Sequence, residues 1–331
     1  MNEKTKIKSI GVLCSGGDSP GMNCAIRAVV RTGVGLGLNI YGIRRGFQGI
    51  LEGDIVKMDA SSVGNIIQHG GTILKTSRCL DFYDPATRKE AFNILKRKKI
   101  DALVVIGGDG SFNGAYRLHE EHGIPIAGIP GTIDNDITGT DYTVGFDTAV
   151  QTAVEAVDKI RDTASSHART FIVEVMGRQS SAIALHVGVC TGAENIILPS
   201  KDRQDLNIEQ ISADINRGIA RGKNSSIIIA AEGETPGLCH RVQKELMSEY
   251  NLQAHICILG HIQRGGNPSS LDRFLASRMG YIAIDSLVSG LKCFATCFIQ
   301  GEVNPTPLEG CLEKRVEYRP YYEELAKKLS I

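Results

Sequence analysis

Short apolar runs alternate along the chain with longer segments in which apolar and charged residues recur at helical spacing. We expect the short runs to form strands at residues 9–14, 39–43, 101–107, 124–129, 170–175, 225–231 and 255–260. Most of these runs are continuously apolar, which is typical of strands buried on both faces of a parallel sheet. The segment that starts near Thr148 and residues 86–99 are the clearest helices, each with an apolar stripe opposite charged residues. This βαβα order predicts an α/β fold with helices on both faces of the sheet.

The composition narrows the class of protein. A chain of 331 residues predicts one large or two medium domains, and 42% hydrophobic with 22% charged residues is ordinary for a soluble globular protein. The 37 basic and 37 acidic residues balance, which gives no support for a nucleic-acid or membrane partner. The nine cysteines form no C-x-x-C pair, so we expect buried thiols in a reducing cytosol rather than zinc ribbons or redox pairs. Because no signal peptide or membrane span is visible, we expect a cytoplasmic protein.

Two glycine-rich loops follow predicted strands, where ligands bind in open α/β sheets. The first is "SGGDSPGMN", with Gly16 and Gly17, and the second is "IGGDGS", from Gly107 to Ser111. Glycines let the backbone approach a phosphate, and the amides of a helix N-terminus bind it. Either loop alone could be an ordinary turn between a strand and a helix, but two in one domain predict a nucleotide. Asp109 is well placed to hold a Mg²⁺ ion that bridges nucleotide phosphates.

A third loop, "PGTIDND", carries Asp134 and Asp136 after another apolar run. As an isolated string it could be a capped turn, a metal site or the general base that a phosphoryl acceptor hydroxyl needs. Because Asp109 already supplies a metal ligand, the base is the favoured interpretation. Arginines near later strand ends match phosphate dianions bidentately and indicate a phosphorylated substrate: Arg169, Arg178 and Arg264.

The assembled loops resemble those of the ATP-dependent 6-phosphofructokinases of the bacterial type. The series "SGGDSPGMN", "IGGDGS", "PGTIDND", "EVMGR" and "LGHIQRGG", in this order, carries the resemblance over nearly the whole chain. "GGDGS" alone would be less specific, because related loops occur in NAD kinases and diacylglycerol kinases. The resemblance implies two Rossmann-like three-layer domains with mainly parallel sheets. The larger, ATP-binding domain would comprise residues 1–144 and 260–311, and the smaller, sugar-phosphate-binding domain residues 145–259 and 312–331.

The resemblance also assigns roles to matching positions. Asp134 would be the base and Asp109 the Mg²⁺ ligand in phosphoryl transfer from ATP to the 1-hydroxyl of fructose 6-phosphate, with Thr132 and Arg178 as the other catalytic residues. The residues implied to bind ATP are Gly17, Arg78, Cys79, Gly108, Asp109, Gly110 and Ser111. The residues implied to bind the sugar phosphate are Thr132, Ile133, Asp134, Asp136, Arg169, Met176, Gly177, Arg178, Glu232, His255, His261, Ile262, Gln263 and Arg264.

The family's effector site binds ADP or phosphoenolpyruvate between subunits. The positions that match it are Arg27, Arg31, Arg161, Gly192, Ala193, Glu194, Arg221 and Lys223. Because family members also share cationic substrate-binding residues between subunits, the resemblance implies a homotetramer.

Two glycines bear on the phosphoryl donor. Pyrophosphate-dependent members of the family carry Asp in place of Gly110 and Lys in place of Gly131. A carboxylate at 110 would block the α-phosphate of ATP, and a lysine at 131 would supply a cation for pyrophosphate. Both positions therefore favour ATP. The alternatives are a pyrophosphate-dependent enzyme and a non-catalytic protein that senses nucleotide and sugar phosphate; the latter would not need Asp109, Asp134 and Arg178.

Several positions depart from the family pattern. His255 replaces an arginine that reaches the sugar phosphate across a subunit boundary, and a shorter, largely neutral imidazole predicts weaker binding that strengthens below pH 7. Cys79 replaces an aromatic residue near adenine. In the effector pattern, Ala60, Asn65 and Asn224 replace an Arg, an Asp and a Lys, so we expect an attenuated effector response.

Overall fold

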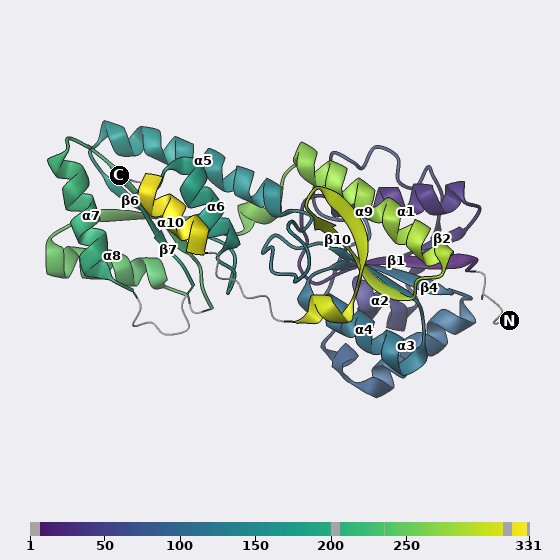
Figure 1. Cartoon of the computed structure of the whole chain (residues 1–331). Helices are drawn as coiled ribbons and strands as arrows, with labels where there is room; N and C mark the ends of the chain where they lie inside the picture. Colours follow the sequence, from purple (N-terminus) through teal and green to yellow (C-terminus); the bar gives the residue numbers. More distant parts are fainter. Residues whose placement is uncertain (1–6, 200–205, 235, 314–319, 330–331) are drawn as a thin grey trace. The chain divides into compact units, whose positions relative to one another are not determined.

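The computed structural model describes residues 7–199, 206–234, 236–313 and 320–329, which form two compact units (Figure 1). The first unit contains the chain up to Thr148 and the segment that starts at Arg264. The second contains Ala149–Gln263 and the C-terminal helix. The chain therefore passes between the units after Thr148 and after Gln263, and both units are discontinuous.

The first unit is built on a sheet of seven described strands in the order β11-β10-β5-β4-β1-β2-β3. The strands are β1 (Ser9–Ser15), β2 (Asn39–Ile43), β3 (Ile55–Met58), β4 (Ala102–Gly107), β5 (Ile126–Pro130), β10 (Cys293–Ile299) and β11 (Glu302–Pro307). The five inner strands are parallel, and the edge strands β3 and β11 run antiparallel to their neighbours. Parallel strands point their carboxyl ends to one edge of the sheet, so the loops after β1, β4 and β5 emerge side by side.

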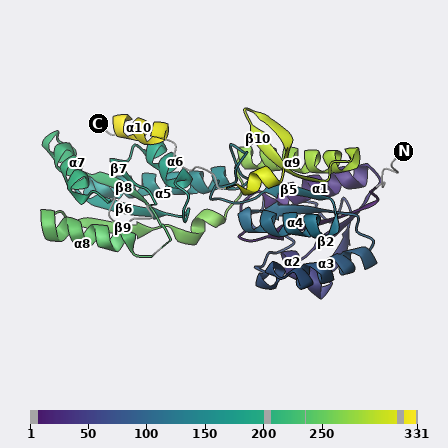
Figure 2. The ribbon, with the colours of Figure 1, turned by 60° about the horizontal axis from the view of Figure 1, so that its bottom comes forward.

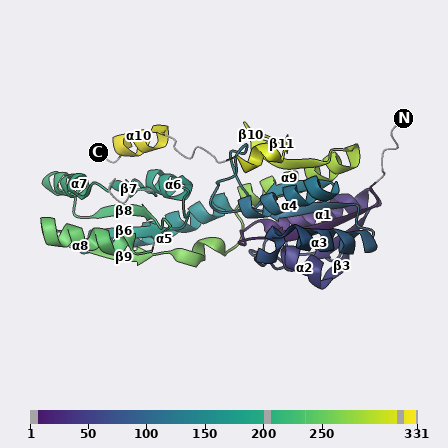
Figure 3. The same ribbon diagram turned by 90° about the horizontal axis from the view of Figure 1, so that it is seen from below.

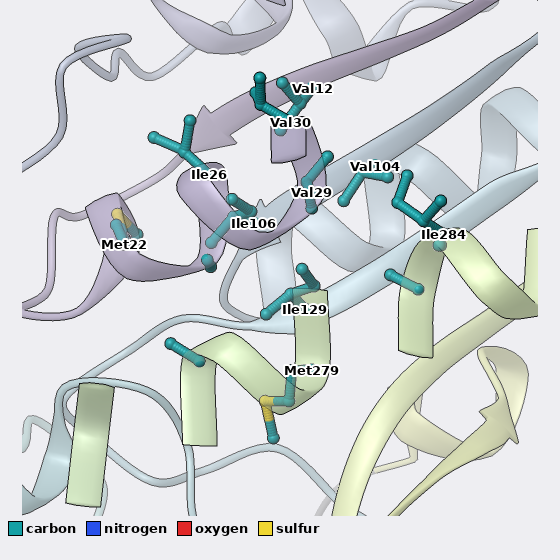
Figure 4. Packing of buried hydrophobic residues seen from close by; sticks show 14 of the residues in the cluster. Val12, Met22, Ile26, Val29, Val30, Val104, Ile106, Ile129, Met279 and Ile284 are labelled. Carbon is teal, nitrogen blue, oxygen red and sulfur yellow. The ribbon is translucent and has the colours of Figure 1, made fainter. Parts of the chain in front are cut away.

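Helices cover both faces of this sheet (Figure 2). Helices α1 (Met22–Gly35) and α9 (Ser270–Ser289) pack on one face, and α2 (Gly46–Glu52), α3 (Pro85–Arg97) and α4 (Asp109–His122) pack on the other. Side chains alternate across β1: Val12 joins the α1–α9 cluster shown in Figure 4, whereas Leu13 joins the opposite cluster. This burial on both faces explains why the strand sequences are continuously apolar.

The second unit has a smaller sheet of four parallel strands in the order β7-β8-β6-β9. The strands are β6 (Thr170–Val175), β7 (Asn195–Ile197), β8 (Ser226–Ala231) and β9 (Ala254–Ile258). The helices are α5 (Phe146–Ser166), which begins in the first unit, α6 (Ala182–Thr191), α7 (Ile208–Ala220), α8 (Leu238–Tyr250) and α10 (Pro320–Leu329). Helix α10 packs beside α6 (Figure 3). The two mainly parallel sheets with flanking helices confirm the predicted α/β fold of two Rossmann-like domains.

The sequence pattern located seven of the described strands but missed four others, β3, β7, β10 and β11, of which β10 is an inner, largely buried strand. Strand β11 contains Pro305 and Pro307, which cannot donate ladder hydrogen bonds and are tolerated because this strand lies at the sheet edge. Of the nine cysteines, all free, only Cys190 is exposed, as expected for small apolar residues. Within the described residues, no helix is long and apolar enough to cross a bilayer.

One buried carboxylate joins the starts of α5 and α9. The carboxylate of Asp272, which is 1% exposed, accepts hydrogen bonds from the backbone N–H of Gly145 at 2.7 Å and of Thr148 at 2.8 Å, and from the Thr148 hydroxyl. Its own N–H donates to the N-cap hydroxyl of Ser269 at 3.2 Å. A negative charge at the N-terminus of α5 satisfies amides that have no partner within the helix.

Burial of the Asp272 carboxylate predicts a pH-dependent contribution to stability, because it outweighs the opposing effect of these hydrogen bonds on the pKa. Burial raises the pKa of Asp272 to about 6, against about 4 for an unfolded Asp. The folded state therefore binds the proton more tightly, and its advantage, present below about pH 4, is lost as the pH rises through 6. Relative to Asp272→Asn, wild type should lose on the order of 2–3 kcal/mol of unfolding free energy between pH 4 and 7, measured by denaturant titration. A difference that does not vary with pH would contradict this assignment.

Candidate active site

Three strand-end loops meet at the carboxyl edge of the first sheet, as expected from the adjacency of β5, β4 and β1. The N–H of Gly131 donates to the Gly107 carbonyl at 3.0 Å, which joins the third loop to the second. A Cβ added to Gly107 would lie 2.5 Å from the Ser15 carbonyl oxygen and 2.7 Å from Ser111 Oγ. The loops thus pack so closely that a side chain at Gly107 would separate them.

The first glycine loop contacts Arg264, a residue distant in sequence. Nη1 of Arg264 donates to the Asp18 carbonyl at 3.1 Å, and a Cβ on Gly17 would lie 2.7 Å from the same nitrogen. The Thr76 hydroxyl donates to the Gly16 carbonyl at 2.8 Å from the segment that precedes Arg78. The guanidinium expected to bind the sugar phosphate therefore lies against the loop expected to bind ATP.

The second glycine loop ends in the first turn of α4, where Asp109 is the first helical residue. Asp109 is exposed, and its Oδ1 accepts a hydrogen bond from Asn113 Nδ2 at 2.9 Å. Although the residue is exposed, partial desolvation of its carboxylate by neighbouring groups raises the pKa of Asp109, and the Asn113 hydrogen bond opposes this. A Cβ at Gly110 would have no atom within 4 Å, so the space beside Asp109 is open.

The third loop carries the two acids. Asp134 is 8% exposed, and its N–H donates to Thr132 Oγ1 at 3.2 Å. A Cβ on Gly108 would lie 3.5 Å from the Cβ of Thr132, so the hydroxyl-bearing residue lies beside the second glycine loop. Ile133 is completely buried, and any substrate contact at this position would have to involve its backbone.

Residues at the strand ends of the second unit form a separate cluster. After β6, the Met176 N–H donates to Gln263 Oε1 at 2.8 Å, and the Arg178 N–H donates to Glu232 Oε1 at 3.1 Å. Gly177 has a φ of 142° that L side chains rarely adopt. These contacts bring together the carboxyl ends of β6, β8 and β9 and leave the Arg178 side chain exposed.

Gln263 is one of the residues that the resemblance implies to bind the sugar phosphate. Its side chain is completely buried, and its carbonyl oxygen accepts a hydrogen bond from the Met176 N–H. Its neighbour Ile262 is 57% exposed, and His261 is also exposed. The side chain of Gln263 therefore acts on this cluster by holding the turn after β6.

Arg169 and His255 lie at the opposite, amino-terminal edge of the second sheet. Arg169 directly precedes β6, and His255 lies in β9 beside Phe171, with ring centroids 5.3 Å apart. At about 3.3 Å per residue, seven residues of extended chain place Arg169 about 20 Å from Met176. One unit therefore cannot bring these two basic residues to the strand-end cluster around Arg178.

Comparison with known proteins identifies the family. A family model described as phosphofructokinase matches residues 9–287. The chain is 47% identical over 325 residues to ATP-dependent 6-phosphofructokinase 1 of Thermus thermophilus, which covers 98% of this chain and 100% of the relative. It is 52% identical over 284 residues to ATP-dependent 6-phosphofructokinase of Halalkalibacterium halodurans, covering 86% and 87%. The chain belongs to the phosphofructokinase family. This confirms the resemblance inferred from the motifs.

Solved phosphofructokinases have the same fold. The phosphofructokinase of Saccharomyces cerevisiae aligns with a TM-score of 0.86 and 32% identity, and that of Pichia pastoris in the T-state with 0.85 and 33%. These alignments cover 98% and 94% of this chain, which spans 48% and 36% of those longer chains. A pyrophosphate-dependent phosphofructokinase from Marinobacter aquaeolei, with a TM-score of 0.81 and 20% identity, shares the fold alone.

Some of the residues that the resemblance assigns to an effector site form a cluster in the second unit. Glu194 Oε1 lies 3.7 Å from Arg161 Nη1 and 3.2 Å from Lys223 Nζ, and Glu194 Oε2 accepts the Ile227 N–H. Arg161 also donates to the carbonyls of Thr191 and Gly192. Exposed Arg221 donates to the Arg217 carbonyl, and Ala193 is buried. Arg27 and Arg31 are on α1 in the first unit.

Two residues with contacts to the predicted site were missed by the sequence analysis. Asn113 bonds Asp109 from four residues along α4, a spacing that the sequence already shows. Asn135, between the two acids, has a positive φ of 49° and is 5% exposed. Its role could not be inferred from sequence, because its hydrogen-bond partners depend on how the following loop returns.

Proposed function

We propose that the protein transfers the γ-phosphoryl group of ATP to the 1-hydroxyl of fructose 6-phosphate, giving fructose 1,6-bisphosphate and ADP. The observation that carries this proposal is the convergence of the three loops: Asp134 lies on a loop packed against the one that carries Asp109. The named relatives, near 50% identical over most of their length, are ATP-dependent 6-phosphofructokinases.

In this proposal Asp134 accepts the proton of the attacking hydroxyl, and Thr132 helps to orient it. The amides of the two glycine loops and the first turn of α4 bind the phosphates of ATP. Arg178 offsets the negative charge that spreads over the transferring oxygens. Arg78 and Cys79 bind the rest of the nucleotide, although Cys79 Sγ already donates to Gln48 Oε1.

The residues present fit a Mg²⁺ ion that arrives with the nucleotide. Within the described residues, no group of three His, Cys, Asp or Glu side chains could hold a metal alone. Asp109 is a single exposed carboxylate beside open space, which suits an ion that keeps water and phosphate ligands. When bound, the ion neutralises charge on the transferred group.

One coupled assay tests the proposal. Purified protein with fructose 6-phosphate and Mg²⁺ is expected to release ADP rapidly with ATP as donor and to turn over far more slowly with pyrophosphate. A third reaction with GTP in place of ATP measures how much the adenine ring contributes to donor selectivity. Equal or faster turnover with pyrophosphate would reject ATP dependence, and absence of turnover with every donor would support a non-catalytic sensor.

We further propose that the sugar phosphate is bound by residues from more than one chain, in a homotetramer. Arg169 and His255 lie at the opposite sheet edge from Met176, Gly177, Arg178 and Glu232. The distance between these two ends of the strands is longer than a hexose phosphate. The two groups of residues can therefore both contact substrate only if they contribute to different substrate-binding sites of an oligomer. His261 and Arg264 complete the proposed phosphate ligands, with Asp136 in support of Asp134.

Replacing His255 with arginine is expected to lower the KM for fructose 6-phosphate by about tenfold. An added charge-assisted hydrogen bond contributes about 1.5 kcal/mol, which is about tenfold in affinity. His240→Arg, which adds the same charge at an exposed position of α8, is the control and should leave KM unchanged. An unchanged KM in His255→Arg would remove His255 from the site.

We propose an attenuated response to ADP or phosphoenolpyruvate in a cytoplasmic enzyme. Glu194 already pairs with Arg161 and Lys223, and Asn224 supplies no further cation. Phosphoenolpyruvate is therefore expected to shift the fructose 6-phosphate saturation curve by less than about threefold, in steady-state assays. A shift of tenfold or more would contradict the attenuation.

A further inference from the structure

Asn135 cross-links the two limbs of the loop that carries the acids. Its Nδ2 donates to the Asp141 carbonyl at 3.0 Å, and its Oδ1 accepts the Thr143 N–H at 2.9 Å. Both partners belong to the returning limb of the loop, six and eight residues further along the chain. A single side-chain amide therefore bonds two successive backbone groups opposite the acids.

Other contacts fix this returning limb to the sheet. The Thr143 hydroxyl donates to the Thr132 carbonyl at 2.6 Å, and Gly131 and Val144 pair as a parallel bridge. The Phe298 N–H at the end of β10 donates to Thr140 Oγ1 at 3.0 Å, and the Asp141 N–H donates to the Phe298 carbonyl. The limb is thus held by β10, and Asn135 bonds to a rigid partner.

The backbone at Asn135 has a direct effect on both acids. Its φ of 49° is in the left-handed region, which Asn tolerates better than other side chains do. This dihedral sets the direction in which the chain leaves Asp134 and enters Asp136. Without the amide bonds, an alternative right-handed conformation would become accessible and would displace both carboxylates.

We infer that Asn135 is a positioning residue for phosphoryl transfer, holding Asp134 at the acceptor hydroxyl. This inference rests on the proposed function, because it needs Asp134 to be the base. A misplacement of about 1 Å in a reacting group can cost on the order of 100-fold in rate. The loss should appear in kcat, because Asp141 and Thr143, which the Asn135 amide bonds, lie outside the two glycine loops expected to bind ATP.

Asn135→Gly tests this inference, because glycine keeps the left-handed conformation and removes the amide. The expected result is a 10- to 100-fold lower kcat with the MgATP dissociation constant within about twofold of wild type. Asn251→Gly makes the same change at an exposed Asn with φ of 53° at the end of α8, and should leave kcat unchanged. Calorimetry gives the MgATP affinity, and circular dichroism gives the folded fraction.

A second variant keeps the test decisive if Asn135→Gly does not fold. Asn135→Asp retains the size and the acceptor for the Thr143 N–H but loses the donor to the Asp141 carbonyl. At least a fivefold loss in kcat would support the inference, and kcat within twofold would overturn it. Asp134→Asn is assayed in parallel: if it alone loses activity, the base stands and Asn135 has no positioning role, whereas if it retains activity, the proposed base itself fails.

Discussion

Asp134→Asn is expected to lower kcat by about 10²–10⁴, the range found when a general base is removed. Asparagine has the same shape but cannot accept the hydroxyl proton. Because Asp134 lies on the third loop, and the amides expected to bind phosphate lie on the other two, the MgATP dissociation constant should change little. Steady-state assays give kcat, and calorimetry without the sugar phosphate gives the MgATP affinity.

The control for this experiment is an exposed carboxylate on helix α5 in the second unit. Asp158→Asn on α5 removes the same charge from the surface and should leave kcat unchanged. Turnover of Asp134→Asn within a few-fold of wild type would show that another group takes the proton. An equal loss of MgATP binding would instead show that Asp134 supports the nucleotide site.

Gly110→Asp is expected to lower kcat/KM for ATP by about 100-fold while the protein remains as stable as wild type. The position is exposed in the first turn of α4, a Cβ there would meet no atom within 4 Å, and an acidic residue is favourable at a helix N-terminus. Placing a carboxylate beside a phosphate costs several kcal/mol, and about 3 kcal/mol corresponds to about 100-fold. Steady-state kinetics and thermal unfolding measure the two effects.

Gly110→Asn is the matched control, because it has nearly the same volume without the charge. A much smaller effect of Asn on ATP use would assign the loss to electrostatic repulsion, and equal effects would assign it to size. Full ATP activity in Gly110→Asp would remove this glycine as a determinant of the donor. Activity with pyrophosphate is measured in the same preparations.

Gly131, the other glycine that favours ATP as the donor, cannot be tested by a similar substitution. Gly131 is buried, and a Cβ there would lie 3.0 Å from Ile106 Cγ2 and 3.3 Å from Met22 Cε. Gly131→Lys would force a charged side chain into this contact and is expected to destabilise the fold before it changes the donor. In the sequence both glycines favour ATP equally, but the packing shows that a side chain would fit at Gly110 and not at Gly131.

Features that depend on residues close together in the sequence were predicted, and features that depend on distant contacts were not. The continuously apolar strands β1, β4, β5, β6 and β8 were predicted because burial on both faces requires an unbroken run of apolar residues. The strands β3 and β11 were missed because they lie at sheet edges, where short or proline-containing segments are tolerated. Glycine loops and acids after strands were recognised because their spacing is local.

The sequence by itself determined the α/β class, the family and the loops that carry Asp109 and Asp134, since these depend on residue types in local order. The tertiary structure decided what depends on distant contacts. It placed Arg264 against the Gly17 loop, buried Gln263 behind Met176, and put Arg169 and His255 at the far edge of their sheet. It also showed Asn135 bonded to Asp141 and Thr143, because hydrogen bonds between loop limbs form only when the sheet brings those limbs together.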